Sequence, residues 1–176
     1  MVLPTISSIG GFLDARPLYG RDRYRAVRAT IPPYPRSLAK KVIEQNLGFF
    51  WKGCLMNQGL NRGEILFVYD GMSAMLKRAL NILMALNGLY FWAGEPRWIE
   101  YWSKRMKWCP PDLWPRIERL YSDSPDKALA ELERLQEEVL FLISRHMPEV
   151  DMIRATKFDE LRVQTTAKRP KLKYIK

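Results

Sequence analysis

The sequence ILFVYDGMSAMLKRALNILMALNGLY, residues 65–90, decides the fold. Its apolar residues recur at intervals of three and four, which places them on one side of an α-helix. They are Ile65, Val68, Met72, Met75, Ala79, Leu83, Leu86 and Tyr90. This spacing predicts a long helix with one face against a hydrophobic core. We therefore expect this helix to lie at the centre of the protein.

A second, polar stripe runs along the same helix. Asp70, Lys77 and Asn81 are separated by seven and four residues, so they share a face other than the apolar one. A solvated surface explains this pattern, because helices of soluble proteins expose polar residues. The alternative is one wall of a polar cleft. The sequence leaves both interpretations open.

The segment FWAGEPRW, residues 91–98, follows this helix as an aromatic elbow. Together with Tyr90 it supplies Trp92, Arg97 and Trp98, and aromatic rings beside a guanidinium suit the stacking of a base or sugar and the binding of a phosphate. Aromatic residues between two helices also simply fill the corner. The candidate residues for binding a substrate or nucleotide are Asp70, Lys77, Asn81, Tyr90, Arg97 and Trp98.

Proline, glycine and polar residues divide the rest of the chain into further helical segments. The expected helices cover residues 21–30, 37–60, 97–108 and 112–121, and a last one that begins at Ser124-Pro125-Asp126 and ends at Met147-Pro148. Almost no segment alternates between apolar and polar residues as a strand does. We therefore predict an all-α fold, an up-and-down bundle of about five or six helices joined by short loops.

Composition divides the chain into three parts. Residues 1–20 contain Gly10-Gly11 and little periodicity, which predicts an extended, linker-like segment. Residues 21–160 are expected to form the helical bundle domain. Residues 161–176 form a basic tail, which is either a solvated, mobile end or an arm that binds nucleic acid.

Positive charge is concentrated near the N-terminus. The net charge of +10 favours polyanionic partners. The candidate nucleic-acid-binding residues are Arg21, Arg23, Arg25, Arg28, Lys40 and Lys41. The same patch could instead bind the acidic face of a partner protein, and the sequence does not choose between them.

The sequence lacks the residues that several kinds of catalytic and metal site require. His146 is the only histidine, which argues against a hydrolytic triad and excludes an HExxH zinc site. Cys54 and Cys109 form no CxxC pair, so they are interpreted as free, buried thiols in a reducing compartment. The N-terminus does not resemble a signal peptide, and no apolar run reaches the length of a membrane span. We expect a soluble, cytoplasmic protein that does not associate with a membrane.

From residue 34 to about residue 151, the order of features resembles the helical C-terminal half of bacterial two-domain nucleotidyltransferases of the polymerase-beta type, in a branch related to the aminoglycoside-modifying enzymes. The residues that carry the resemblance are Tyr34-Pro35 with Leu38, Lys77-Arg78, Leu80, Leu83-Met84-Ala85-Leu86-Asn87, Tyr90, Arg97-Trp98, Pro110-Pro111-Asp112-Leu113 and Met147-Pro148-Glu149-Val150-Asp151. The similarity covers roughly two thirds of the chain.

In that family the N-terminal half carries a Gly-Ser turn and paired aspartates that bind magnesium and nucleotide. This chain has neither a Gly-Ser dipeptide nor an Asp-x-Asp pair, and it has Arg97 where the family usually has lysine. The resemblance therefore implies a helical half without its catalytic half, with no catalytic residue, metal site or cofactor of its own. Magnesium and nucleotide would be bound only together with a separate catalytic subunit.

Two classes of function follow from the sequence. The first is a substrate-binding or accessory module of nucleotidyl transfer, which works with a separately encoded catalytic partner. The second is a stand-alone basic helical protein that binds nucleic acid or an acidic protein. A homo-oligomer is compatible with both.

Overall fold

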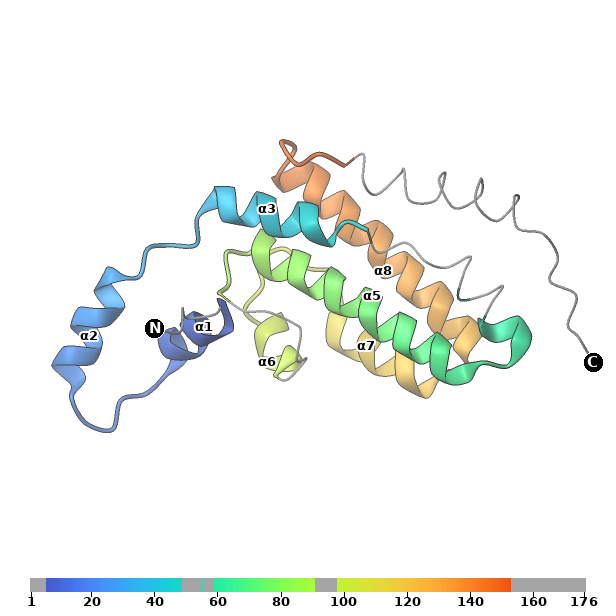
Figure 1. Cartoon of the computed structure of the whole chain (residues 1–176), viewed down its shortest axis with the longest axis horizontal. Helices are drawn as coiled ribbons and strands as arrows, with labels where there is room; N and C mark the ends of the chain where they lie inside the picture. The colour runs from blue at the N-terminus through green and yellow to red at the C-terminus, as the bar shows by residue number, and fades with distance from the viewer. Residues whose placement is uncertain (1–5, 49–54, 56–58, 91–97, 153–176) are drawn as a thin grey trace, which may run out of the picture.

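The computed structural model describes residues 6–48, 55, 59–90 and 98–152 (Figure 1). Within these ranges the chain forms seven α-helices and no strand, so the all-α prediction is confirmed. The helices are α1 (Ile6–Asp14), α2 (Arg21–Thr30), α3 (Arg36–Asn46), α5 (Ile65–Leu86), α6 (Ile99–Ser103), α7 (Leu113–Ser122) and α8 (Pro125–His146), and the short 3-10 helix η2 (Leu60–Arg62) precedes α5.

Four of these helices, α3, α5, α7 and α8, form the bundle (Figure 1). Helix α5 packs against both α3 and α8, and α8 packs in turn against α7. Successive bundle helices run in opposite directions, as the up-and-down prediction requires (Figure 1). Every residue of α5 from Ala79 to Leu86 is buried, because this half of the helix has neighbours on all sides. The predicted central helix is therefore central.

The predicted apolar stripe of α5 is buried from Val68 to Leu86, whereas Ile65 at its start is 45% exposed. The helix ends in a Schellman motif, in which the N–H of Leu89 donates to the carbonyl of Met84 at 2.9 Å and the N–H of Gly88 to that of Ala85 at 3.1 Å. This ending requires a left-handed residue, and Gly88 has a φ of 65°. Tyr90 is therefore not part of the helix.

Two other predicted helices are shorter than expected. Helix α3 ends at Asn46, whose side-chain amide donates to the carbonyl of Val42 at 2.8 Å, and not at residue 60. Helix α6 has only five residues within the predicted range 97–108, and a turn in which the N–H of Met106 donates to the carbonyl of Ser103 follows it. Helix α8 begins and ends where the sequence predicts.

The prediction that residues 1–20 are extended is wrong for residues 6–14, which form α1. Its apolar residues Ile6, Ile9, Phe12 and Leu13 have helical spacing, a signal that Gly10-Gly11 obscures. Helix α2 has no buried residue and contacts α1 through the ring of Tyr24, whose centroid lies 4.9 Å from that of Phe12. We call α1, the loop 15–20 and α2 the N-terminal arm, which extends to one side of the bundle (Figure 1).

Arg116 joins α7 to α8 and is one of the few buried charged residues in the described part of the chain. Its guanidinium donates to Glu131, and also to both carboxylate oxygens of Glu138 at 2.8 Å. Two carboxylates contact one largely buried cation, so its charge is compensated at a position with little water around it.

Among the described helices, none has both the length and the apolar character needed to cross a membrane. Cys109 is a free, half-buried thiol, and burial raises its pKa. Cys54 and the basic tail lie outside the described residues.

Candidate functional site

The predicted polar stripe of α5 does not lie on a single surface. Asp70 is exposed and Lys77 is half-buried. Asn81 lies in the core, and its side-chain amide donates to Oδ1 of Asn46 at 3.3 Å. The interpretation of this stripe as a solvated surface is therefore wrong for Asn81, which is buried beside Asn46 of α3.

The aromatic elbow is described only in part. The hydroxyl of Tyr90 donates to the carbonyl of Pro32 at 3.1 Å, and its ring lies 4.8 Å from that of Tyr34. Burial, followed by the neighbouring Tyr90, raises the pKa of Tyr34 to about 12. Tyr90 thus fills the corner before α3. Trp92 and Arg97 lie outside the described residues.

Trp98 is the described elbow residue that faces water. Its side chain is 76% exposed, and its φ of 63° turns the chain sharply into α6. Of the six predicted substrate-binding residues, Asn81 and Tyr90 hold the core together, and Asp70, Lys77 and Trp98 are the described ones that reach the surface. None of these three lines the pocket described next.

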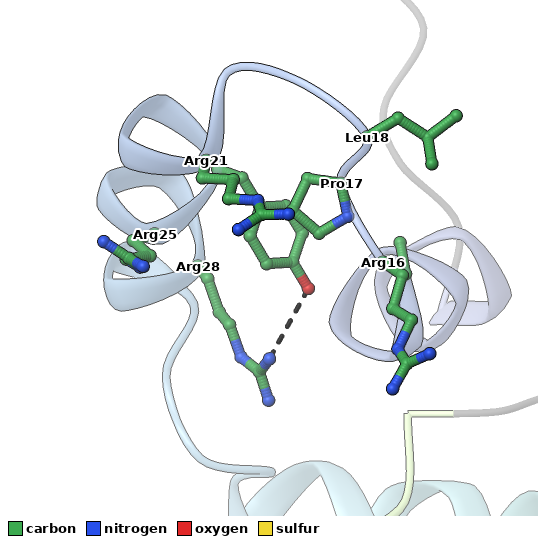
Figure 2. Close-up of a pocket in the computed structure, with 8 residues that line it drawn as sticks. Arg16, Pro17, Leu18, Arg21, Arg25 and Arg28 are labelled. Atoms are coloured by element: carbon green, nitrogen blue, oxygen red, sulfur yellow. Dashed lines mark hydrogen bonds between the residues drawn. The ribbon is translucent and has the colours of Figure 1, made fainter.

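The arm, by contrast, encloses a pocket of about 610 Å³ between its loop and α2 (Figure 2). Four of the eight lining residues are arginines: Arg16, Arg21, Arg25 and Arg28. Ala15, Pro17, Leu18 and Tyr24 complete the lining. Half of the residues around this concave surface therefore carry a positive charge.

Helical spacing explains why three of these arginines meet. Arg21, Arg25 and Arg28 are separated by four and three residues and therefore project from one side of α2. Arg23 lies on another side of the helix and does not line the pocket. Lys40 and Lys41 belong to α3, outside the pocket, and the ammonium of Lys40 lies 3.7 Å from Glu44. The predicted basic patch thus separates into an arginine pocket and three residues outside it.

Tyr24 holds the pocket in shape. Its hydroxyl donates to the carbonyl of Phe12 at 3.0 Å and accepts from Arg28 at 3.5 Å, so one group links α1, α2 and a lining arginine. The left-handed Gly20, with a φ of 64°, turns the loop into α2, and its carbonyl accepts from the N–H of Tyr24 at 3.0 Å. The loop is therefore fixed at both ends.

Few acids neutralise this pocket. Asp22 pairs with Arg25 at 3.0 Å on the exposed side of α2. In the described part of the chain, Arg16 and Arg21 bond to no carboxylate, and Arg28 bonds only to the Tyr24 hydroxyl. The arm contains five arginines against two aspartates, a net charge of +3.

Sequence reasoning placed Arg21, Arg25 and Arg28 in the candidate list but missed Tyr24 and Arg16 as site residues. The signal for Tyr24 was present, because it lies three residues after Arg21 and four before Arg28. Arg16 could not be found, since its position depends on the turn at Gly20.

Within the described residues, no group of three or more histidine, cysteine, aspartate or glutamate side chains could hold a metal ion. Comparison of the chain with protein-family models, with curated proteins and with solved structures finds no match. The proposed function therefore depends on the geometry of the chain itself.

Proposed function

We propose that this protein binds nucleic acid, and that the arginine pocket of the N-terminal arm contacts the phosphate backbone. The observation that supports this is that Arg16, Arg21, Arg25 and Arg28 line one open pocket. Guanidinium groups present paired N–H donors that match phosphate oxygens. A pocket lined by several of them suits a ligand that carries several phosphates.

The spacing along α2 suits a phosphate chain. Because an α-helix rises about 1.5 Å per residue, Arg21 and Arg25 lie about 6 Å apart along its axis, and Arg28 lies one further turn along. This step is comparable to the distance between neighbouring phosphates of one strand. Successive phosphates can thus meet successive guanidinium groups.

The electrostatic setting is also favourable. The pocket arginines belong to a segment with little compensating acid, so their potential acts on the surrounding solvent. Helix α2 has no buried residue, and the bundle therefore does not depend on its side chains. These side chains are free to serve binding.

The test measures the binding of a fluorescent oligonucleotide at several salt concentrations. In the variant R21Q/R25Q/R28Q we expect weaker binding and a less steep dependence of log K on log salt. Each lost phosphate contact removes about 0.7 from the slope on a single strand, so the triple variant loses about 2. Glutamine has a helix propensity close to that of arginine, so α2 should persist, and circular dichroism checks this.

The matched control is R62Q/K127Q/R145Q, which removes the same charge from three exposed positions in η2 and α8. It should leave affinity and slope nearly unchanged. An equal loss in both triple variants would show that only the overall charge acts, which would contradict a site in the arm.

That this chain is the substrate-binding module of a nucleotidyltransferase stays a prediction. Its support is the resemblance described above together with the surface positions of Asp70 and Lys77. Calorimetry with a nucleotide and magnesium, with and without a catalytic partner, tests it, and Lys77→Ala and Arg97→Ala should weaken any binding found. No heat of binding in either case would contradict it.

A further inference from the structure

The tip of the arm carries the most exposed large apolar side chains of the described chain. Leu18 and Tyr19, in the loop between α1 and α2, are each 90% exposed. Arg16 and Arg21 flank them in the sequence, two positions to either side. An exposed aromatic ring between two arginines is unusual for a surface without a ligand, because tyrosine rings normally bury most of their area.

The loop is well placed to present these side chains outward. It begins with a turn in which the N–H of Ala15 donates to the carbonyl of Phe12 at 3.2 Å, and Gly20 ends it. In Figure 2, Arg21 lies between the loop and α2, and Leu18 extends from the loop at the edge of the pocket, which it helps to line. The tip therefore offers apolar surface beside the arginines that line the pocket.

Stacking on an unpaired base is the interaction that uses all of these features. Every base has an aromatic face, and a tyrosine ring beside guanidinium groups binds that face while the cations hold the backbone. A double helix keeps the faces of its bases stacked on one another, so a short loop cannot reach them. Only a single strand can give both contacts.

We propose that Tyr19 stacks on an unpaired base, so that the ligand of the arginine pocket is single-stranded nucleic acid. This inference depends on the proposed function, which supplies the phosphate contacts. It adds that the ligand is single-stranded and that Tyr19 is the residue that distinguishes a single strand from a duplex. Leu18 covers the edge of the stacked base.

The test compares three probes of equal length, about 12 nucleotides, a typical extent for a single-strand site. The probes are a single strand of deoxythymidine, a strand of abasic sugar-phosphate units and a duplex. The wild-type protein should bind the deoxythymidine strand most tightly. Tyr19→Ala should weaken binding to that strand about tenfold or more, since the loss of one stacked base has this size, and should leave the abasic strand unaffected.

Two further variants separate stacking from general effects. Tyr19→Trp keeps an aromatic face and should retain the affinity for the deoxythymidine strand. Phe141→Ala removes an exposed aromatic ring from α8, away from the arm, and should change nothing. Both positions are on the surface, so folding is not at risk.

Four outcomes would overturn the inference. If Tyr19→Ala weakens the base-bearing and abasic strands equally, no stacking occurs, although the arginine pocket still binds phosphate. If the wild type prefers the duplex, the ligand class is wrong. If Tyr19→Ala instead loses binding to vesicles of phosphatidylcholine and phosphatidylglycerol while the strand is still bound, the tip contacts lipid. Failure of the wild type to bind any strand would remove the proposed function as well.

Discussion

The guanidinium of Arg105, just after α6, donates to the carboxylate of Asp14 at the end of α1, with 2.7 Å between Nη1 and Oδ1. The other oxygen of Asp14 accepts from the hydroxyl of Tyr101 at 2.7 Å, and this bond is the main reason why the pKa of Tyr101 is raised. Arg105 also lies over the rings of Tyr101 and Trp102, 5.2 and 5.3 Å from their centroids. One aspartate thus ties the arm to the body of the protein.

Asp14→Ala should release the arm without unfolding the bundle. The ion pair is partly exposed, so its loss should lower the free energy of unfolding by less than about 1 kcal/mol. Tryptic cleavage after Arg21 should become several-fold faster, because a less constrained loop is cut more readily. Glu44→Ala, which removes the pair with Lys40 within α3 and lies away from the cleaved bond, is the control. Equal cleavage rates in both variants would mean that Asp14 does not hold the arm.

Arg116→Met should destabilise the protein by about 2–4 kcal/mol. The change leaves Glu138 without its cation and Glu131 with only the exposed Arg134, at a partly buried position, which costs more than the loss of a surface pair. Urea unfolding followed by circular dichroism measures the difference. Arg134→Met removes only the exposed partner of Glu131 and should cost less than about 1 kcal/mol. A similar, small effect of both substitutions would show that Arg116 does not join α7 to α8.

The same cluster predicts how stability depends on pH. Burial tends to raise the pKa of Glu131, but the hydrogen bond and charge of Arg116 outweigh it, so the pKa is lower in the folded protein than in the unfolded chain. The stabilisation is complete above the unfolded value, about 4.3, and is lost as the pH falls through the folded value. Glu131→Gln should therefore flatten the decline of unfolding free energy in acid. Glu137→Gln, at an exposed position of α8, should keep the wild-type profile, and equal profiles would contradict the assignment.

The sequence predicted the helices whose ends are determined by residues at or next to those ends. Ser124-Pro125-Asp126 and Met147-Pro148 determine α8, and the long apolar stripe determines most of α5. Helix α1 was missed because its two glycines weaken helix propensity, while its apolar spacing is short. The end of α3 at Asn46 was missed because the apolar spacing of the sequence continues beyond it.

The candidate site was predicted less completely, because side chains with the same spacing can have opposite surroundings. Asn81 has the spacing of a surface residue, yet it is buried and its amide bonds to Asn46 of α3. Tyr90 has the chemistry of a stacking residue, yet its hydroxyl bonds to the carbonyl of Pro32. The arginines of α2 could be predicted as a group because one helix carries them, whereas Arg16 joins them only through the loop.

The side-chain amide of Asn87 makes four hydrogen bonds at the end of α5. Its nitrogen donates to the carbonyls of Leu83 and Trp108, each at 2.8 Å, and its oxygen accepts from the N–H groups of Lys107 and Trp108 at 2.7 and 2.8 Å. Asn87→Ala should lower the free energy of unfolding by about 2–4 kcal/mol, since buried partners lose their bonds. Asn87→Asp should be at least as harmful, because a carboxylate cannot donate to two carbonyls. Asn61→Ala, at an exposed position of η2, is the control, and a cost below about 1 kcal/mol for Asn87→Ala in urea unfolding would show that this amide does not fix the corner.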